Sequence, residues 1–447
     1  MNGDRPPGEK ATRIRWLVFT LAFATSWFLY LHRYTWGVIK PDVKATFGFD
    51  DTQLGILDSC FSISYALCQI PTGILGDVFG PRAVLSTSIF AWSGLMATFV
   101  ATGSVWSLGA VRALFGIAQA GTYPNLGKLT RAWYPRTIRT TIQGAVASFG
   151  GRAGGACAAL IVSTLLMGQL GLSWQVTVMT IASLGIALAL LFYLLVRNTP
   201  KEHPSTNETE RDLIGVEDPP DDSPGTKAKK KLRFSRIPAI RLSFAFMLAH
   251  IFLSAAADQL FVNWIPLFLS EEKGLGRLEL GVYASLPLWA GAIGGMVGGV
   301  LNDLILRLTG RLRLARTVIG FTGKAIAGAL VIVAIQFEDG RSMMLVIAAA
   351  KFFTDWSQPT MWGAVTDISG RAAATVFGTV NMVGSLGGVA SNPTFGYVKQ
   401  HYGWNTVFWL IAAVYVISAV CWFWVNTTRP LVVDDTDGEG SSSDASR

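Results

Sequence analysis

The sequence has few charged residues. Asp, Glu, Lys and Arg make up only 15% of its 447 residues, whereas about 25% is usual in soluble domains. Hydrophobic residues make up 51%, so polar side chains are too scarce to cover a surface that faces water. The composition therefore excludes an ordinary soluble domain and predicts an integral membrane protein.

Cysteine is also scarce, and the four that occur lie in apolar segments without metal-ligand spacing: Cys60, Cys68, Cys157 and Cys421. We expect them to be small apolar packing residues, not disulfides or metal ligands. The sequence also lacks a phosphate-binding Walker loop and a nucleophile–base arrangement. We therefore expect no enzymatic activity, no metal site and no cofactor.

Long apolar segments occur on both sides of a polar break. A helix needs about 20 apolar residues to cross the hydrocarbon layer of a bilayer. Such segments are 16–40, 53–76, 83–104, 106–130, 140–169, 174–196, 241–270, 279–305, 316–337, 342–367, 373–399 and 404–426. They predict an all-α fold with twelve transmembrane helices in two pseudo-symmetric six-helix bundles.

The polar break and the two ends of the chain complete the predicted domain organisation. The break is rich in Pro, Asp, Glu, Lys and Ser, which predicts a mobile linker on the membrane surface. The predicted parts are an N-terminal segment 1–13, bundles 14–197 and 241–428, the linker 198–240 and a disordered tail 429–447.

Basic residues are distributed asymmetrically. With both ends inside, the cytoplasmic segments hold 26 Lys and Arg residues and the external connections hold 6. The positive-inside rule then predicts cytoplasmic termini and linker in a bacterial-type inner (plasma) membrane. This distribution accounts for the net charge of +8 without a nucleic-acid partner. No cleavage site follows the basic N-terminal residues, so we expect the first helix to be retained.

The two halves repeat a short pattern. Gly73-Ile-Leu-Gly-Asp77 recurs as Gly299-Val-Leu-Asn-Asp303, at an offset of 226 residues. Parallel six-helix repeats are typical of transporters that rock about a site near the middle of the membrane.

Two arginines interrupt predicted spans. Arg33 lies within 16–40 and Arg112 within 105–129. An arginine near the middle of a membrane costs about 2.5–3.5 kcal/mol and usually faces water, a partner or a ligand. The pair predicts a positively charged, water-filled cavity that binds anions. A structural salt bridge or a clamp on backbone carbonyls is the alternative for each.

The run of residues from Gly73 to Arg82 resembles the motif of a known family. The run from Gly73 through Asp77 and Gly80 to Arg82 matches the pattern G-x-L-x-D-x-x-G-x-R of the major facilitator superfamily. The resemblance implies that these residues, with Asp303, brace cytoplasmic helix ends and hold one conformation until substrate arrives.

More narrowly, the chain resembles the anion:cation symporter branch, which includes carriers of sugar acids. The matching pieces are Tyr30–Arg33, Arg112–Gly116 with Pro124, Asn263–Pro266, and Gly378–Asn381 with Gly387, Gly388 and Pro393. Sugar-phosphate antiporters share the first arginine but carry a second one near the position of Asp258 here, which disfavours a phosphate ester as substrate.

Two departures from the branch concern proton coupling. Many proton-coupled members have Asp where this chain has His32, and Glu where it has Gln119. A coupling proton then needs His32 or an intramembrane carboxylate, or protons are not used. The carboxylate candidates are Asp58, Asp258 and Asp355. Lys351, four residues before Asp355, predicts an ion pair within one helix.

The remaining candidates are polar residues that suit a sugar-like anion. Shifting Arg33 by the repeat offset leads to Gln259, and Asn263 lies on the same helical face. Amides can bind sugar hydroxyls, and tyrosines can stack on a sugar, although interhelical bonds and interface anchoring are alternatives. The predicted substrate-binding residues are Arg33, Arg112, Tyr30, Tyr65, Gln119, Tyr123, Gln259, Asn263 and Asn381.

These features predict a secondary transporter that moves a small organic anion, such as a sugar acid, by alternating access. The expected partners are the anion, a co-transported cation (H⁺ or Na⁺) and the lipid bilayer, and we expect a monomer. The alternatives are an anion exchanger of the organophosphate/phosphate type and a transporter-like sensor of an anionic metabolite.

Overall fold

The computed structural model describes residues 10–135, 138, 142–215, 232–234, 237–369, 373–428 and 431–434. The chain divides into two compact units. Unit 1 contains Met1–Gly48 and Cys60–Ser223, and unit 2 contains Phe49–Ser59 and Pro224–Arg447. The boundary after Ser223 falls inside the predicted linker, whereas residues 49–59 belong to unit 2 although the sequence placed them in the first bundle.

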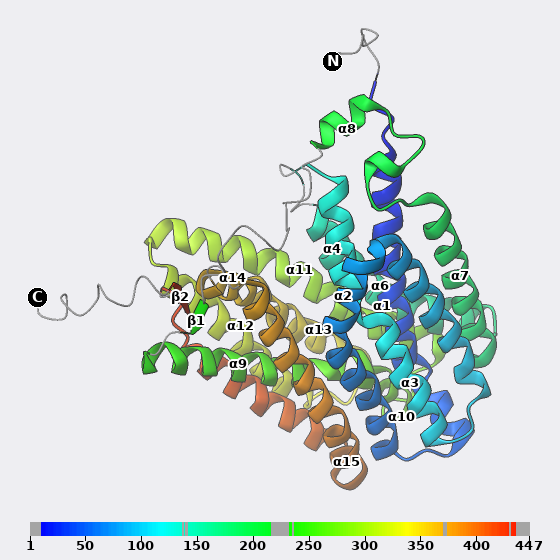
Figure 1. Cartoon of the computed structure of the whole chain (residues 1–447). Coiled ribbons are helices and arrows are strands. Elements are labelled where there is room, and N and C mark those ends of the chain that lie inside the picture. Colours follow the sequence, from blue (N-terminus) through cyan, green and yellow to red (C-terminus); the bar gives the residue numbers. More distant parts are fainter. Residues whose placement is uncertain are drawn as a thin grey trace, which may run out of the picture. The chain divides into compact units, whose positions relative to one another are not determined.

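Unit 1 consists of helices (Figure 1). They are α1 (Ile14–Phe47), α2 (Asp51–Thr98, whose first residues belong to unit 2), η1 (Phe99–Ala101), α3 (Val105–Ala120), α4 (Thr122–Trp133), η2 (Gly144–Gly150), α6 (Gly151–Ala159), η3 (Leu160–Gln169), α7 (Trp174–Leu195), η4 (Pro200–Glu202) and α8 (Glu208–Ile214).

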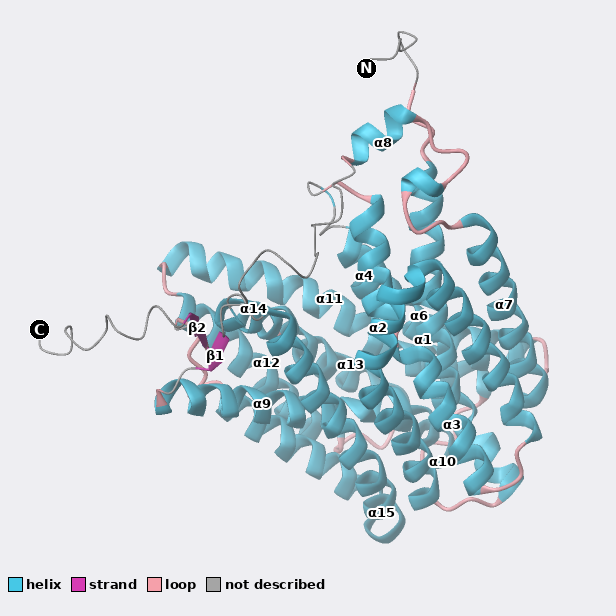
Figure 2. Ribbon diagram, in the orientation of Figure 1, coloured by secondary structure: helices cyan, strands magenta, loops and turns pink. Residues whose placement is uncertain are grey.

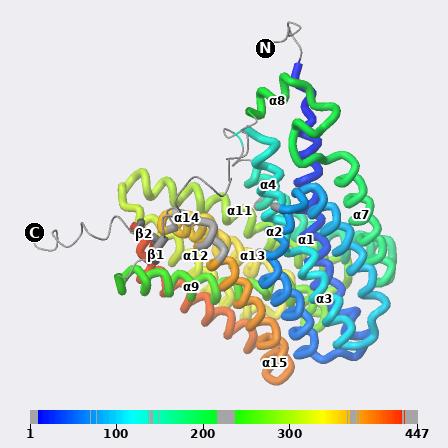
Figure 3. Tube along the Cα trace, viewed as in Figure 1, coloured from blue at the N-terminus to red at the C-terminus, as the bar shows by residue number. Residues whose placement is uncertain are grey.

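Unit 2 is also helical, apart from two short strands (Figure 2). Its elements are β1 (Leu232–Phe234), α9 (Pro238–Gln259), η5 (Leu260–Trp264), α10 (Ile265–Glu271), α11 (Arg277–Thr309), α12 (Leu312–Ala334), α13 (Gly340–Trp356), α14 (Gln358–Ser369), α15 (Ala373–Cys421) and β2 (Val432–Asp434). Within this unit α9 packs along α15 (Figure 3).

The predicted helical class is confirmed. Helix covers most of each of the twelve predicted segments, and eight helices within the described part of the chain are long and apolar enough to cross a membrane. One of the eight, Thr379–Cys421, includes most of both predicted spans 373–399 and 404–426, and the remaining predicted spans are broken or more polar. For example, Gly121 separates α3 from α4, and α13 gives way to α14 at Ser357.

Helix α7 shows why such helices suit lipid. Leu184, Leu190 and Leu194 are exposed, whereas Leu188 and Phe192 are buried against the rest of unit 1. An apolar helix with an exposed apolar face has no favourable solvent except a lipid bilayer.

Two long helical paths are broken at glycine. The backbone of Gly80 has φ 78° and ψ 154° within α2, and that of Gly403 has φ 80° and ψ 175° within α15. Residues with a side chain rarely adopt such a positive φ, so glycine permits each sharp bend. At Gly80 an added Cβ would also lie 2.8 Å from the Asn198 amide. These constraints give a physical reason for Gly80 in the sequence pattern.

The first part of the linker docks on the start of α1. Glu210 on α8 is fully buried, and its carboxylate accepts hydrogen bonds from the Thr12 hydroxyl and from the backbone N–H groups of Ile14 and Arg15. Those N–H groups belong to the first turn of α1, where helical partners are missing. Residues of the predicted linker thus contact the start of α1; the predicted mobility of the linker stays a prediction, and 216–231 lie outside the described residues.

A short antiparallel ladder joins the end of the linker to the tail. Leu232, Arg233 and Phe234 of β1 pair with Asp434, Val433 and Val432 of β2. This two-stranded sheet is an addition to the predicted all-α fold, and it places three residues of the predicted disordered tail in a strand.

Candidate functional site

Arg33 lies in an aromatic cage within unit 1. Its guanidinium carbon is 5.0 Å from the ring centroid of Tyr30, 4.5 Å from that of Tyr65 and 5.1 Å from that of Phe61. Its Nε donates a 3.1 Å hydrogen bond to Oε1 of Gln119. Its Nη2 is buried and has no hydrogen-bond partner among the described residues. A buried, unused donor on a permanent cation suits an anionic ligand.

Gln119 orients Arg33 without cancelling its charge. The fully buried amide accepts from Arg33 through Oε1 and donates through Nε2 to the carbonyl oxygen of Leu29, 3.4 Å away. A glutamate here would form an ion pair with the guanidinium. The departure from the branch pattern at this position therefore leaves a net positive charge in the cage.

Tyr123 forms a further wall of the cage. Its hydroxyl lies 3.0 Å from Oγ of Ser26 and donates to the carbonyl of Ala147 at 3.3 Å. The ring centroids of Tyr123 and Tyr30 are 6.4 Å apart, in an edge-on arrangement. Gly151 of α6 leaves the space for both side chains, because an added Cβ would lie 2.9 Å from the Tyr123 hydroxyl and 2.9 Å from Cε2 of Tyr30. Hydroxyls and ring faces thus gather beside one cation.

Arg112 is near the cage but more deeply buried. Its side chain is 2% exposed, and its guanidinium carbon lies 4.4 Å from the ring centroid of Trp36 and 5.2 Å from that of Phe61. Both arginines therefore contact Phe61. Sequence reasoning missed Phe61, although it lies one helical turn before Tyr65 and so on the same face of α2.

His32 faces away from the cage, although it is adjacent to Arg33 in the sequence. Its Nδ1 lies 2.8 Å from the carbonyl oxygen of Phe28, and its Nε2 lies 3.4 Å from Oγ of Ser93. Gly185 of α7 packs closely against the ring. Consecutive residues on a helix point in different directions. Arg33 therefore contacts Gln119, whereas the adjacent His32 packs among other helices.

In unit 2 the predicted amides belong to a network. Nδ2 of Asn263 donates to Oε1 of Gln259 at 2.9 Å and to Oδ1 of Asn392 at 3.2 Å. Trp264 also donates to Oδ1 of Asn392, at 3.2 Å. Asn392 was not predicted, and only its place one turn after Gly388 hinted at a role. Asn381 lies exposed on the same helix, α15.

The predicted ion pair in α13 is present and has an additional member. Nζ of Lys351 lies 2.9 Å from Oδ1 of Asp355 and 3.2 Å from Oδ1 of Asp258 on α9. The Tyr415 hydroxyl donates to that same oxygen of Asp258 at 2.9 Å. Asp58 is fully buried in the part of α2 that belongs to unit 2. Three of the four coupling candidates thus lie in unit 2.

The predicted gate residues are only partly described. Arg82 donates through Nε and Nη2 to the carbonyl oxygen of Tyr193, at 2.9 and 2.7 Å, and so caps the end of α7. Helix C-terminal carbonyls favour such cations. The carbonyl of Gly73 accepts from Nζ of Lys128 at 2.8 Å. Asp303 is exposed, and the side chain of Asp77 lies outside the described residues.

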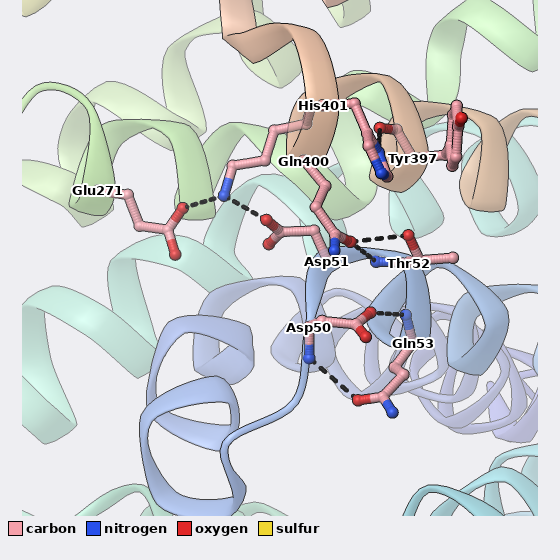
Figure 4. A network of polar contacts seen from close by, with 9 residues as sticks. Asp50, Asp51, Thr52, Gln53, Glu271, Tyr397, Gln400 and His401 are labelled. Atoms are coloured by element: carbon pink, nitrogen blue, oxygen red, sulfur yellow. Dashed lines mark hydrogen bonds and ion pairs between the residues drawn. The ribbon is translucent and has the colours of Figure 1, made fainter.

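A second set of charges lies at the start of α2, within unit 2 (Figure 4). Nζ of Lys399 on α15 lies 2.6 Å from Oδ2 of Asp51 and 2.8 Å from Oε2 of Glu271. The side chain of Thr52 also donates to that of Gln400 at 2.8 Å. We call Asp51, Glu271 and Lys399 the Lys399 clamp. No sequence pattern indicated it.

Taken together, the apolar helices and the buried cations define a multi-pass membrane protein of the transporter type. The chain belongs to the Major Facilitator Superfamily, whose family model matches residues 17–392. The predicted family is thus confirmed, as is the expectation of a transporter and not an enzyme.

Relatives and solved structures agree with this assignment. The chain is 28% identical to the probable sulfoacetate transporter SauU of Cupriavidus necator, over 92% of this chain and 93% of the relative. It is also 28% identical to the probable galactarate/D-glucarate transporter GudP of Bacillus subtilis, over 89% and 88%. A bacterial homolog of the human lysosomal transporter Spinster, solved inward-facing and unoccupied, shares the fold with a TM-score of 0.69 at 17% identity, over 95% of both chains.

Proposed function

We propose that the protein imports a small organic anion of the sugar-acid class across the inner membrane by alternating access, with its termini in the cytoplasm. The observation that carries this proposal is the Arg33 cage. A guanidinium there keeps a buried, unused donor at Nη2, and its Nε donates to the neutral amide of Gln119. The planar fork of donors on arginine suits a carboxylate.

The neighbours of Arg33 fit the rest of a sugar acid. The hydroxyls and ring faces of Tyr30, Tyr65 and Tyr123 suit a short polyhydroxylated chain beside the carboxylate. The amides of unit 2 described above are further proposed contacts to substrate hydroxyls. The names of the two relatives, which concern sulfoacetate and galactarate or D-glucarate, support an organic acid as substrate.

Uphill import of an anion requires a coupling ion. A monoanion that enters a cell interior at −100 mV works against about 2.3 kcal/mol. Co-transport of one H⁺ or Na⁺ removes this opposition for a monoanion such as D-galactonate, because the moved charge is then zero; dianions such as galactarate, D-glucarate and sulfoacetate require two. We therefore propose cation-coupled symport by a monomer.

Uptake into proteoliposomes tests the proposal. Galactarate, D-glucarate, D-galactonate and sulfoacetate are supplied as labelled substrates, and glucose serves as the neutral control. We expect saturable uptake of at least one acid by the wild type and none of glucose. Arg33→Lys keeps the charge but lacks the fork, so we expect affinity to fall about tenfold or more.

The outcomes separate the alternatives. Binding of an acid without any uptake would replace the transporter by a sensor. Uptake that occurs only against a preloaded anion would replace symport by exchange. Unchanged affinity in Arg33→Lys would remove Arg33 from the substrate contact.

A further inference from the structure

Lys324 is a buried basic residue of unit 2 whose side chain the function proposed above does not use. It lies on α12 with its side chain fully buried. Its Nζ has no hydrogen-bond partner among the residues that the structure describes, and it lies 5.3 Å from the ring centroid of Tyr415. Burying an ammonium without an acceptor costs several kcal/mol, so a fixed charge here has no structural benefit.

The acceptors that suit Lys324 are nearby but occupied. Asp258 and Asp355 attract a charge on Lys324, and Lys351 repels it. Both carboxylates bind Lys351 instead, at 3.2 and 2.9 Å. His250 on α9 is also close enough to interact electrostatically with Lys324, and its Nδ1 lies 2.8 Å from Oγ of Ser418.

Tyr415 connects the lysine to one of these carboxylates. Its ring faces Nζ of Lys324, while its hydroxyl donates to Oδ1 of Asp258 at 2.9 Å. Tyr415 therefore contacts both Lys324 and Asp258. If Asp258 turned from Lys351 to Lys324, Lys351 would still have Asp355 as its partner.

The charge balance makes this arrangement suitable for carrying a proton. With both lysines protonated, the two lysines and two aspartates sum to zero; with Lys324 as an amine, the sum is −1. One proton on Lys324 therefore offsets one negative charge, which is what symport of a monoanion requires.

We propose that Lys324 is the proton-binding group of the transport cycle. In the proposed cycle the amine form of Lys324 accepts a proton from hydronium, which leaves water, and the resulting ammonium is held by Asp258. The N–H bond breaks and the proton returns to water when Asp258 goes back to Lys351. This inference rests on the proposed symport, and it assigns the proton site to unit 2, whereas His32 and the Arg33 cage belong to unit 1.

The test compares Lys324→Arg with Lys324→Met in proteoliposomes loaded with a transported sugar acid. Arginine stays charged and methionine stays neutral, so neither can carry a proton. A one-unit pH gradient can drive about tenfold accumulation in one-to-one symport. We expect both variants to lose this accumulation while exchange of labelled for unlabelled substrate persists. The exposed Lys201→Met serves as the charge-loss control and should behave as wild type.

The arginine variant decides between a proton carrier and a fixed charge. A fixed structural charge predicts that Lys324→Arg accumulates substrate normally, and that result would overturn the proposal. Exchange of substrate by the wild type without accumulation under the pH gradient would also overturn the proposal, while the proposed anion transport would still stand. A wild type that moves no anion at all contradicts the proposed function itself.

A second variant covers the case in which neither substitution at Lys324 folds. Asp258→Asn removes one of the two carboxylates that attract a charged Lys324, so the pH at which driven uptake is half-maximal should fall by about half a unit or more. An unchanged pH profile in Asp258→Asn would overturn the proposal.

Discussion

Gln119 on α3 accepts a 3.1 Å hydrogen bond from Nε of Arg33 on α1, and it does so as a neutral amide. The two side chains are arranged as in an ion pair, but the side chain of Gln119 is neutral. Arg33 is thereby fixed in position, and its positive charge remains for an incoming ligand. This relationship gives a physical meaning to the missing carboxylate at position 119.

Gln119→Glu should convert this site into a closed ion pair at neutral pH. The new carboxylate would compete with the substrate for Arg33, so we expect affinity for the anion to fall about tenfold or more at pH 7.5. Calorimetric binding at pH 7.5 measures the loss.

Gln119→Leu is the matched control, since it removes the hydrogen bond without adding charge. We expect a smaller loss of affinity. Equal losses in the two variants would show that the amide acts through orientation alone.

Sequence reasoning found the cage because its members follow helical spacing around an intramembrane cation. Tyr30 and Arg33 lie three residues apart, and Arg112 and Gln119 lie two turns apart on α3. It could not assign the partners of Asp258, because Lys351 and Tyr415 come from other helices. Periodicity describes one helix at a time and contains no information on interhelical packing.

The twelve segments were recognisable because apolar length is a local property, but local irregularities were not. The π-helical segments η2, η3 and η5 add residues to a turn and shift every later side chain. The position of Lys399 beside Asp51 depends on a contact between residues 348 positions apart. No pattern within either segment points to the other.

Gly55 and Gly396 mark a close backbone contact within unit 2. A Cβ at Gly55 would lie 2.4 Å from the carbonyl oxygen of Asn392, and one at Gly396 would lie 2.2 Å from that of Asp51. Gly55→Ala should therefore destabilise this arrangement by about 1–3 kcal/mol through overpacking. Thermal unfolding in detergent measures the loss.

Gly94→Ala, on the same helix α2, is the control because nothing lies within 4 Å of an added Cβ there. It should be neutral or slightly stabilising, since alanine favours helix by up to about 1 kcal/mol over glycine. Equal melting temperatures for the two alanine variants would contradict the close contact.

The Lys399 clamp should govern turnover more than affinity. Lys399→Met leaves the buried carboxylate of Asp51 and that of Glu271 without their shared cation, which weakens the hold of α15 on the start of α2. Because α2 continues from there into unit 1, we expect the maximal uptake rate to change about threefold or more, with Kd within about twofold. Lys399→Arg should retain the wild-type rate. A change in Kd with an unaltered rate would exclude the clamp from the conformational equilibrium.

His203 should make the docking of the linker depend on pH. Its Nδ1 accepts from the backbone N–H of Ser205, and its Nε2 lies 3.2 Å from the carbonyl oxygen of Leu195, so the neutral ring suits both neighbours. Burial lowers the pKa of His203, and the nearby Arg197 lowers it further, although the bond to Leu195 opposes them. Protonation of Nδ1 would place its N–H against the backbone N–H of Ser205, and two donors cannot bind each other.

The pKa of His203 in the docked state lies below the ordinary value of about 6.5. Neutral His203 therefore stabilises docking above pH 6.5, and this stabilisation is lost as the pH falls below 6.5 and through the pKa of the docked state. Limited proteolysis of residues 198–215 should accordingly be faster at pH 5.5 than at pH 7.5. His203→Gln cannot titrate, and its cleavage rate should depend on pH only as the protease itself does. The exposed His401→Gln should behave as wild type. Equal protection of the wild-type segment at both pH values would remove His203 as the cause.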